Sequence, residues 1–217
     1  FDGVRPRATA EQAYAGLLAA QAHLLSCGIT AWQDAAVGEF MGSPDTVPTY
    51  QRALREGTLR VRVRGAQWWN REAGEAQLET ILARRDEAAA SADPARFSLG
   101  SVKVMVDGVA ENFTAAMHEC YRDHHGHPTD NRGISFFDPN EMADFVTALD
   151  GAGVQVHFHA LGDRAVTEAL DAVERALATN GQMGNRHHLA HLQVVRPEDV
   201  PRFAALGATA NIQALWA

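Results

Sequence analysis

The 217-residue sequence predicts an α/β protein whose parallel strands form part of a (β/α)8 TIM-type barrel with outer helices. Strand-like apolar segments alternate with helix-like segments along the chain. Two of these strands carry histidines, at 157–159 and 187–191, and each leads into a helix. A third strand holds Lys103 among valines. Histidines that end neighbouring parallel strands favour a metal site at one mouth of a barrel.

Start and stop signals define the elements of the N-terminal half. Thr9-Ala10-Glu11-Gln12 is a capping box that opens a helix, and Gly28 ends it. A buried strand follows over 29–34. The dipeptide Ser43-Pro44 is typical of a helix start, and Gly57 of its end. A strictly alternating strand over 59–64 and a helix over about 74–90 complete this half.

The C-terminal half continues the alternation. A long connection over 109–134 separates the strand at 102–106 from a helix that Asp138 caps. The remaining expected elements are a strand over 154–159, a helix from an Asp163 N-cap to Thr179, a strand over 187–192, a short helix over 197–207 and a strand over 209–213.

This count gives six strands, whereas a closed barrel needs eight. The pattern alone therefore allows an open doubly wound sheet or a barrel without its ends. No linker divides the chain, so we expect residues 1–217 to form a single incomplete barrel domain.

Composition excludes several classes of function. A net charge of −8 argues against a nucleic-acid partner, and no apolar run is long enough for a membrane span. Cys27 and Cys120 lie outside any Cys-x-x-Cys pair, which predicts free thiols and a cytoplasmic location. The motifs of serine hydrolases, P-loop NTPases and dinucleotide-binding dehydrogenases are absent from the sequence.

Lys103 is the most diagnostic single residue. Val102 and Val104 flank it in a buried strand, where a charged amine is costly unless it is paired or neutralised. A salt bridge to a carboxylate inside the barrel is the structural interpretation. The chemical interpretation is that a desolvated lysine has a lowered pKa and reacts with carbon dioxide. The resulting carbamate is an anionic oxygen ligand that can bridge two metal ions.

The histidines divide by position along their strands. His157 and His159 share one face of their strand, and His159 is nearer the end at which barrel active sites lie. His191 ends the next strand and is expected beside His159. A structural role remains the alternative for each of them. His187 is expected in the core, and His188 is expected to point toward the helices.

Other polar residues have ordinary structural interpretations. Asp34 and Asp107 follow strands and suit turns, whereas Asp163 suits a helix cap. The long connection carries histidines that are expected to be solvated and two residues that would touch substrate if the loop covered the site. These are His118, His124, His125, His127, Glu111 and Asn112.

Three segments of the chain resemble the amidohydrolase superfamily. They are the runs 103–114 (Lys-Val-Met-Val-Asp-Gly-Val-Ala-Glu-Asn-Phe-Thr), 159–165 (His-Ala-Leu-Gly-Asp-Arg-Ala) and 191–195 (His-Leu-Gln-Val-Val). The branch that they resemble is amidohydrolase family 3, which includes N-substituted formamide deformylases. The resemblance covers nearly the whole chain, and the run around His159 is its most specific motif.

The resemblance implies a metal-dependent hydrolase that acts on an amide or N-acyl C–N bond of a small molecule. It implies that Lys103 is the carboxylated lysine, that His159 and His191 are metal ligands, and that the cofactor is Zn²⁺ or another divalent metal, one or two ions. A deaminase or phosphoester hydrolase of the same superfamily is an alternative. A non-catalytic barrel used for binding or regulation is another.

Two parts of the family pattern are missing from this sequence. The His-x-His of the first strand is expected upstream of Phe1, and the aspartate that acts as general base is expected beyond Ala217. We therefore expect strands two to seven of a barrel, with no catalytic residue inside the chain. As an isolated fragment it is expected to be inactive, to bind metal partially or not at all, and to self-associate through unpaired barrel edges.

Overall fold

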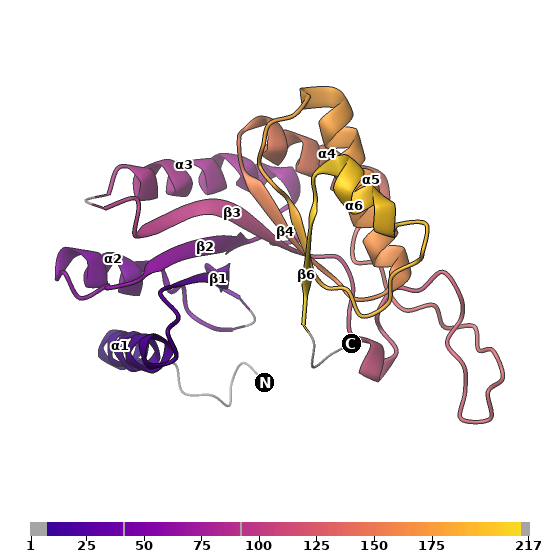
Figure 1. Cartoon of the computed structure of the whole chain (residues 1–217), viewed down its shortest axis with the longest axis horizontal. Coiled ribbons are helices and arrows are strands. Elements are labelled where there is room, and N and C mark those ends of the chain that lie inside the picture. The colour runs from indigo at the N-terminus through magenta and orange to yellow at the C-terminus, as the bar shows by residue number, and fades with distance from the viewer. Residues whose placement is uncertain (1–7, 41, 92, 214–217) are drawn as a thin grey trace. The chain divides into compact units, whose positions relative to one another are not determined.

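The computed structural model describes residues 8–40, 42–91 and 93–213 (Figure 1). Helices and strands alternate along the chain as expected. In order they are α1 (Ala10–Ser26), β1 (Ala31–Val37), α2 (Val47–Arg55), β2 (Arg62–Trp68), η1 (Gly74–Gln77), α3 (Leu78–Ala89), β3 (Phe97–Met105), η2 (Ala110–Asn112), α4 (Pro139–Gly151), β4 (Gln155–Ala160), α5 (Asp163–Asn180), β5 (His188–His191), α6 (Val200–Leu206) and β6 (Thr209–Ile212).

The strands form one six-stranded sheet in the order β1-β2-β3-β4-β5-β6. The pairs β1–β2, β4–β5 and β5–β6 are parallel. A doubly wound sheet reverses its strand order at a switch point, whereas sequential order is typical of a (β/α) barrel. The strand order therefore excludes the open doubly wound alternative, and the predicted count of six strands is confirmed for the part of the chain that the structure describes.

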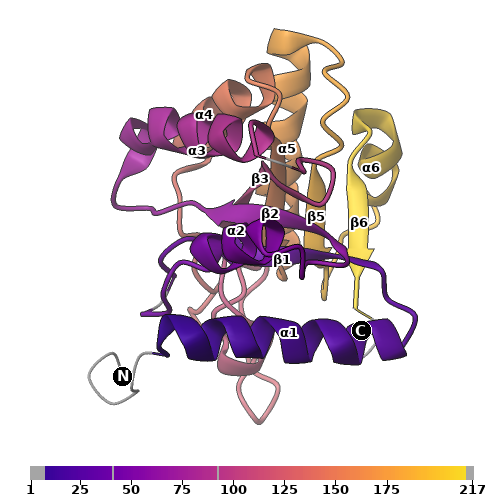
Figure 2. The same ribbon diagram turned by 90° about the vertical axis from the view of Figure 1, so that its left-hand side faces the viewer.

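Contacts divide the chain into two compact units. The first unit comprises Phe1–Trp68 and Ala76–Val102. Its α1 runs alongside β1 (Figure 2) and contacts α2. Alternation into and along the start of β2 buries Val61 and Val63 and exposes Arg60, Arg62 and Arg64, as the sequence predicts. The core of this unit consists of Tyr14, Val37, Val47, Tyr50, Ala53, Leu59, Val61, Val63, Ala88, Phe97 and Leu99.

The second unit comprises Trp69–Glu75 and Lys103–Ala217 and contains the candidate site. Its helices α4 and α5 lie side by side and contact β4 (Figure 1). Val156 and Phe158 are fully buried, as are Val166 and Leu170 of α5. Because β4 is buried along nearly its whole length, its histidines are held in a rigid and largely dry environment.

Two helix starts differ from the predictions. Helix α2 begins at Val47, because Ser43 closes a tight turn by hydrogen bonding with the backbone of Phe40. Helix α5 has Gly162 rather than Asp163 as its N-cap residue. Asp163 instead accepts a hydrogen bond from the backbone N–H of His118, at 2.9 Å. The capping box of Thr9 and Gln12 and the Asp138 cap are confirmed.

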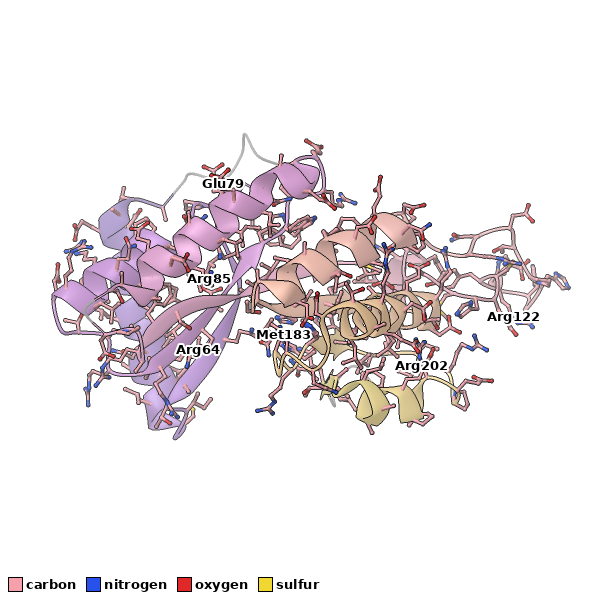
Figure 3. All side chains as sticks on the ribbon, turned by 90° about the horizontal axis from the view of Figure 1, so that it is seen from above. Arg64, Glu79, Arg85, Arg122, Met183 and Arg202 are labelled. Atoms are coloured by element: carbon pink, nitrogen blue, oxygen red, sulfur yellow. The ribbon has the colours of Figure 1, made fainter. Side chains whose placement is uncertain are left out.

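The long connection folds back on itself as an arm, residues 115–134. Backbone hydrogen bonds join its two sides, including Met117 N to Arg132 O at 2.9 Å and Tyr121 N to Asn131 O at 2.8 Å. Arg122 lies at the far end of the arm (Figure 3). Among the described residues, no helix has the length and apolar content needed to cross a membrane.

Candidate metal centre

Lys103 is buried in the second half of β3, with only 7% of its surface exposed. Its Nζ lies 3.2 Å from Nε2 of His157. None of the ion pairs among the described residues includes Lys103, so the predicted salt bridge to a carboxylate is not found there. Burial lowers the pKa of the Lys103 amine to about 8. The lysine therefore has an appreciable unprotonated fraction near neutral pH.

His159 lies two residues beyond His157, near the C-terminal end of β4. Its Nε2 is 3.0 Å from the carbonyl oxygen of Gly108. Because a carbonyl only accepts hydrogen bonds, Nε2 carries the hydrogen, and the lone pair of the neutral ring is on Nδ1. Burial lowers the pKa of His159 to about 4, so the ring is neutral at pH 7. A metal-binding histidine has this arrangement, with one nitrogen donating to a carbonyl.

His191 ends β5 and turns toward His159. Its backbone has a φ of 86°, and the ring centroids of His159 and His191 are 4.7 Å apart. Nδ1 of His191 hydrogen bonds with Oε1 of Gln213, which places the lone pair of the neutral ring on Nε2. The structure therefore brings the two predicted histidines together, with the tautomer of each set by an oxygen acceptor.

The prediction that His188 points toward the helices is wrong. Its ring lies 4.1 Å from the ring of His157, centroid to centroid, and 7% of the residue is exposed. The register of β4 and β5 pairs these two residues directly. The positive φ values of His191 and Leu192 break the two-residue alternation, so His188 and His191 both lie near the histidines of β4.

These side chains form one electrostatic cluster. Burial, which has the largest effect, and the charges of Lys103, His188, His191 and His159 together lower the pKa of His157 to about 2. Two buried ring nitrogens, Nδ1 of His157 and Nε2 of His188, have no hydrogen-bond partner among the described residues. An unsatisfied buried polar group costs about 1–3 kcal/mol and is typical of sites that bind a further group.

Asp107 connects three segments around the histidines, and sequence reasoning assigned it only to a turn. The residue is fully buried. Its Oδ2 accepts hydrogen bonds from the backbone N–H groups of Ala116 and Gly162, both at 2.9 Å, and its Oδ1 accepts one from Leu161 at 3.1 Å. Nε2 of His159 is 3.7 Å from Oδ1. Asp107 thus fixes the loop after β4 and the base of the arm beside His159.

Gly162 also shows how tightly these segments pack. A Cβ atom at this position would lie 2.0 Å from the carbonyl oxygen of Ala116, so a larger residue does not fit without moving the backbone. This close approach lets the Asp107 carboxylate reach the N–H groups of both segments. The Gly-Asp pair after β4 therefore provides no side-chain cap for α5, and its glycine allows the close packing of the two segments.

The other polar residues named from the sequence have structural roles or lie in solvent. His187 contacts Asp150 through Nε2 at 2.9 Å and accepts a hydrogen bond from Val156 N through Nδ1. This pair lines a cavity of about 170 Å³ at the start of β5. Three histidines of the arm are exposed as predicted, namely His124, His125 and His127. The fourth, His118, is half-buried. Glu111 is exposed and accepts a hydrogen bond from Gln193 at 3.2 Å.

Among the described residues, no group of three or more His, Cys, Asp or Glu side chains is arranged to hold a metal ion. The cluster supplies two imidazoles that face each other and a buried amine. An unmodified ammonium group has no acceptor atom, so Lys103 would serve as a further ligand only after loss of its proton or covalent modification.

Buried histidines make the stability of the metal-free protein depend on pH. The pKa values of His157 (about 2), His159 (about 4) and His188 (about 4) lie below the 6.5 of an unfolded histidine. The unfolded chain therefore binds more protons below pH 6.5, and the free energy of unfolding falls as the pH falls toward 4. Burial raises the pKa of Asp107 to about 6, which offsets one of these three protons.

The net difference is about two protons, which predicts a loss on the order of 2 kcal/mol per pH unit between pH 6 and 4. Urea unfolding at several pH values, with a chelator present, measures this slope. A free energy of unfolding that stays constant from pH 7 to pH 5 contradicts the lowered histidine pKa values.

Comparisons with known proteins assign this chain to a family and identify relatives of it. The model of the amidohydrolase family matches residues 1–217. "Protein LONG AFTER FAR-RED 3" of Arabidopsis thaliana is 35% identical over 115 residues, which are 53% of this chain and 19% of that protein. "Putative amidohydrolase YtcJ" of Bacillus subtilis (strain 168) is 30% identical over 115 residues, 52% of this chain and 20% of that protein. The matched part of the chain spans about a fifth of the length of these two relatives.

A solved structure gives the same fold. An uncharacterized metal-dependent hydrolase from Pyrococcus furiosus matches with a TM-score of 0.70 and 24% identity, covering 95% of this chain and 39% of that one. This likeness confirms the predicted fold class, a partial (β/α)8 barrel with parallel strands. The match of the family model to residues 1–217 shows that this chain belongs to the amidohydrolase family.

Proposed function

We propose that the protein is a metal-dependent amidohydrolase that hydrolyses an amide or N-acyl C–N bond of a small molecule. The observation that carries this proposal is the pair His159 and His191. The two imidazoles face each other at adjacent strand ends, and each is held in a fixed tautomer beside a buried lysine. Family membership supports the hydrolase chemistry, because relatives of this fold include a metal-dependent hydrolase.

The residues fit a divalent metal. His159 would bind it through Nδ1 and His191 through Nε2, since their other nitrogens donate hydrogen bonds to Gly108 O and Gln213 Oε1. Lys103 would contribute an oxygen ligand after carbamylation of its buried amine. A set of nitrogen and oxygen ligands suits Zn²⁺ and several other divalent ions. When bound, the ion supplies Lewis acidity toward the substrate carbonyl and the attacking water.

The chain itself orients these ligands and excludes water around them. Asp107 holds the loop after β4, and Gly108 O fixes the ring of His159. Val104 and Val106 are fully buried in and just after β3, so solvent does not reach Lys103 from their side. Glu111 and Gln193, joined by a hydrogen bond, connect the loops that follow β3 and β5. These two exposed loops are where substrate contacts are expected, because specificity in barrels comes from loops.

The test uses the protein expressed from its complete reading frame. We expect bound divalent metal by elemental analysis and hydrolysis of N-acyl amines, with release of the free amine. A chelator should abolish the turnover, and Zn²⁺ should restore it. The substitution K103A should remove both metal and activity, whereas R64A, on the exposed side of β2, serves as the surface control.

The alternatives give different results in the same assay. Faster turnover of aminated bases or of phosphotriesters would identify a deaminase or a phosphoester hydrolase. A well-folded protein without stoichiometric metal and without turnover of any of these substrates would identify a binding or regulatory barrel. Either outcome overturns the amidohydrolase proposal.

A further inference from the structure

The polar surroundings of Lys103 are unusual for a buried amine. Among the described residues, its Nζ has one hydrogen-bond contact, with Nε2 of His157 at 3.2 Å. Nζ of a lysine only donates while it is protonated, so Nε2 of His157 is the acceptor and Nδ1 carries the ring hydrogen. That Nδ1 is itself buried and has no partner among the described residues. The tautomer of His157 is therefore set by the lysine.

His188 holds the ring of His157 in place. The two ring centroids are 4.1 Å apart with an interplanar angle of 38°, and the two residues are 4% and 7% exposed. The residues are also directly paired in the β4–β5 register. His157 therefore lies between Lys103 on one side and His188 on the other. Neither His157 nor His188 belongs to the ligand set proposed above.

We propose that His157, braced by the ring of His188, is a positioning residue that accepts a hydrogen bond from Nζ of Lys103 and thereby sets the direction of the carbamate formed there. This inference rests on the proposed function in one respect, because it takes Lys103 to be carbamylated. It goes further by assigning a role to two histidines outside the ligand set.

The direction of the carbamate follows from the number of N–H groups that remain on Nζ of Lys103 after it reacts. The neutral amine attacks the carbon of carbon dioxide, a new N–C bond forms, and one N–H proton is released to solvent. The product is a planar carbamate that keeps a single N–H. If that N–H continues to donate to Nε2 of His157, the carboxylate group on the same nitrogen must point away from His157. No histidine changes its charge in this sequence.

The structure also explains why two histidines are used. A lone imidazole could rotate about its side-chain torsions and lose the contact with Nζ, whereas packing against the tilted ring of His188 restricts this rotation. A carboxylate in place of His157 would form an ion pair with Lys103 and keep the amine protonated. An imidazole provides the acceptor without this effect.

The experiment measures the carbamate directly, without relying on turnover. The protein, expressed from its complete reading frame, is stripped of metal and equilibrated with ¹³C-labelled bicarbonate at pH 8. The carbamate on Lys103 is then followed by ¹³C NMR as a function of bicarbonate concentration, with K103A as the blank. In H157L the carbamate N–H has lost its acceptor, so the carboxylate group can take more than one direction, and we expect its ¹³C resonance to shift or broaden relative to that of the unmodified protein.

Two further variants separate positioning from simple disruption. H157Q keeps an acceptor oxygen and should recover most of the position and sharpness of the carbamate resonance. H187N removes the buried histidine just before β5, which is 6% exposed and lies outside the cluster, so it should leave the carbamate resonance unchanged even if stability falls. Folding of each variant is checked by circular dichroism and urea unfolding.

The outcomes distinguish this inference from the proposed function. A carbamate resonance in H157L identical to that of the unmodified protein overturns the positioning role and leaves the hydrolase proposal standing. Absence of carbamate from the unmodified protein overturns both the inference and the oxygen-ligand role of Lys103. A change of the resonance in H187N as large as that in H157L also overturns the inference, because the effect would then follow from stability.

Discussion

The substitution H159N is expected to lower kcat/KM for an N-acyl amine by at least about a thousandfold in the protein expressed from its complete reading frame, equivalent to about 4 kcal/mol of transition-state stabilisation. His159 is the more buried of the two facing imidazoles, and its tautomer is fixed by Gly108 O. An asparagine side chain does not present a ring nitrogen at this position. The substitution H191N should have an effect of the same order, because it removes the facing ligand.

The matched control is H187N. His187 is a buried histidine of the same unit, but its ring contacts Asp150 and Val156 N rather than the cluster. We expect H187N to keep its metal content and most of its kcat/KM, although its thermal stability falls. Retention of both metal and activity in H159N would contradict the ligand assignment. Elemental analysis alongside kinetics separates loss of metal from loss of substrate binding.

The substitution D107A is expected to lower the free energy of unfolding by about 3–5 kcal/mol. Three buried backbone N–H groups, from Ala116, Leu161 and Gly162, would lose their common acceptor. Since the site is fully buried, water does not replace the carboxylate without opening the packing. D107N should have a smaller effect than D107A. Its amide oxygen still accepts a hydrogen bond from a backbone N–H, whereas its NH₂ group replaces an acceptor and faces a backbone N–H donor.

A second carboxylate provides the control for this measurement. Asp163 accepts one backbone hydrogen bond, from His118, and is half-buried. We expect D163N to cost about 1 kcal/mol, as for the loss of a single hydrogen bond. Urea unfolding of the variants at pH 7.5 gives the comparison. Equal losses in D107A and D163N would contradict the role of Asp107 as the link between three segments.

Local patterns were sufficient to predict most of the fold. The number and order of the strands follow from alternation and from start and stop residues such as Thr9, Asp138 and Gly207, all of which act within one turn of chain. Boundaries were less accurate where a competing local turn intervenes. Ser43, for example, is held in a turn by Phe40, so the Ser-Pro signal does not open helix α2.

The site was predicted in part. That His157 and His159 share one face of their strand follows from the two-residue period of a strand. The position of His188 was predicted wrongly, because the positive φ values of His191 and Leu192 cannot be read from the period. The function of Asp107 was missed because its three partners come from residues 116, 161 and 162, far away in the sequence.

The sequence by itself determined the α/β alternation, the buried lysine and the histidines at two strand ends, since each depends on propensities and periods that act over a few residues. Only the tertiary structure decided which ring nitrogens of His159 and His191 are left as acceptors, which histidine lies beside Lys103, and which backbone groups Asp107 joins. The physical reason is that hydrogen bonds and ring contacts between distant segments depend on strand register and backbone approach. These arise only when the whole unit packs.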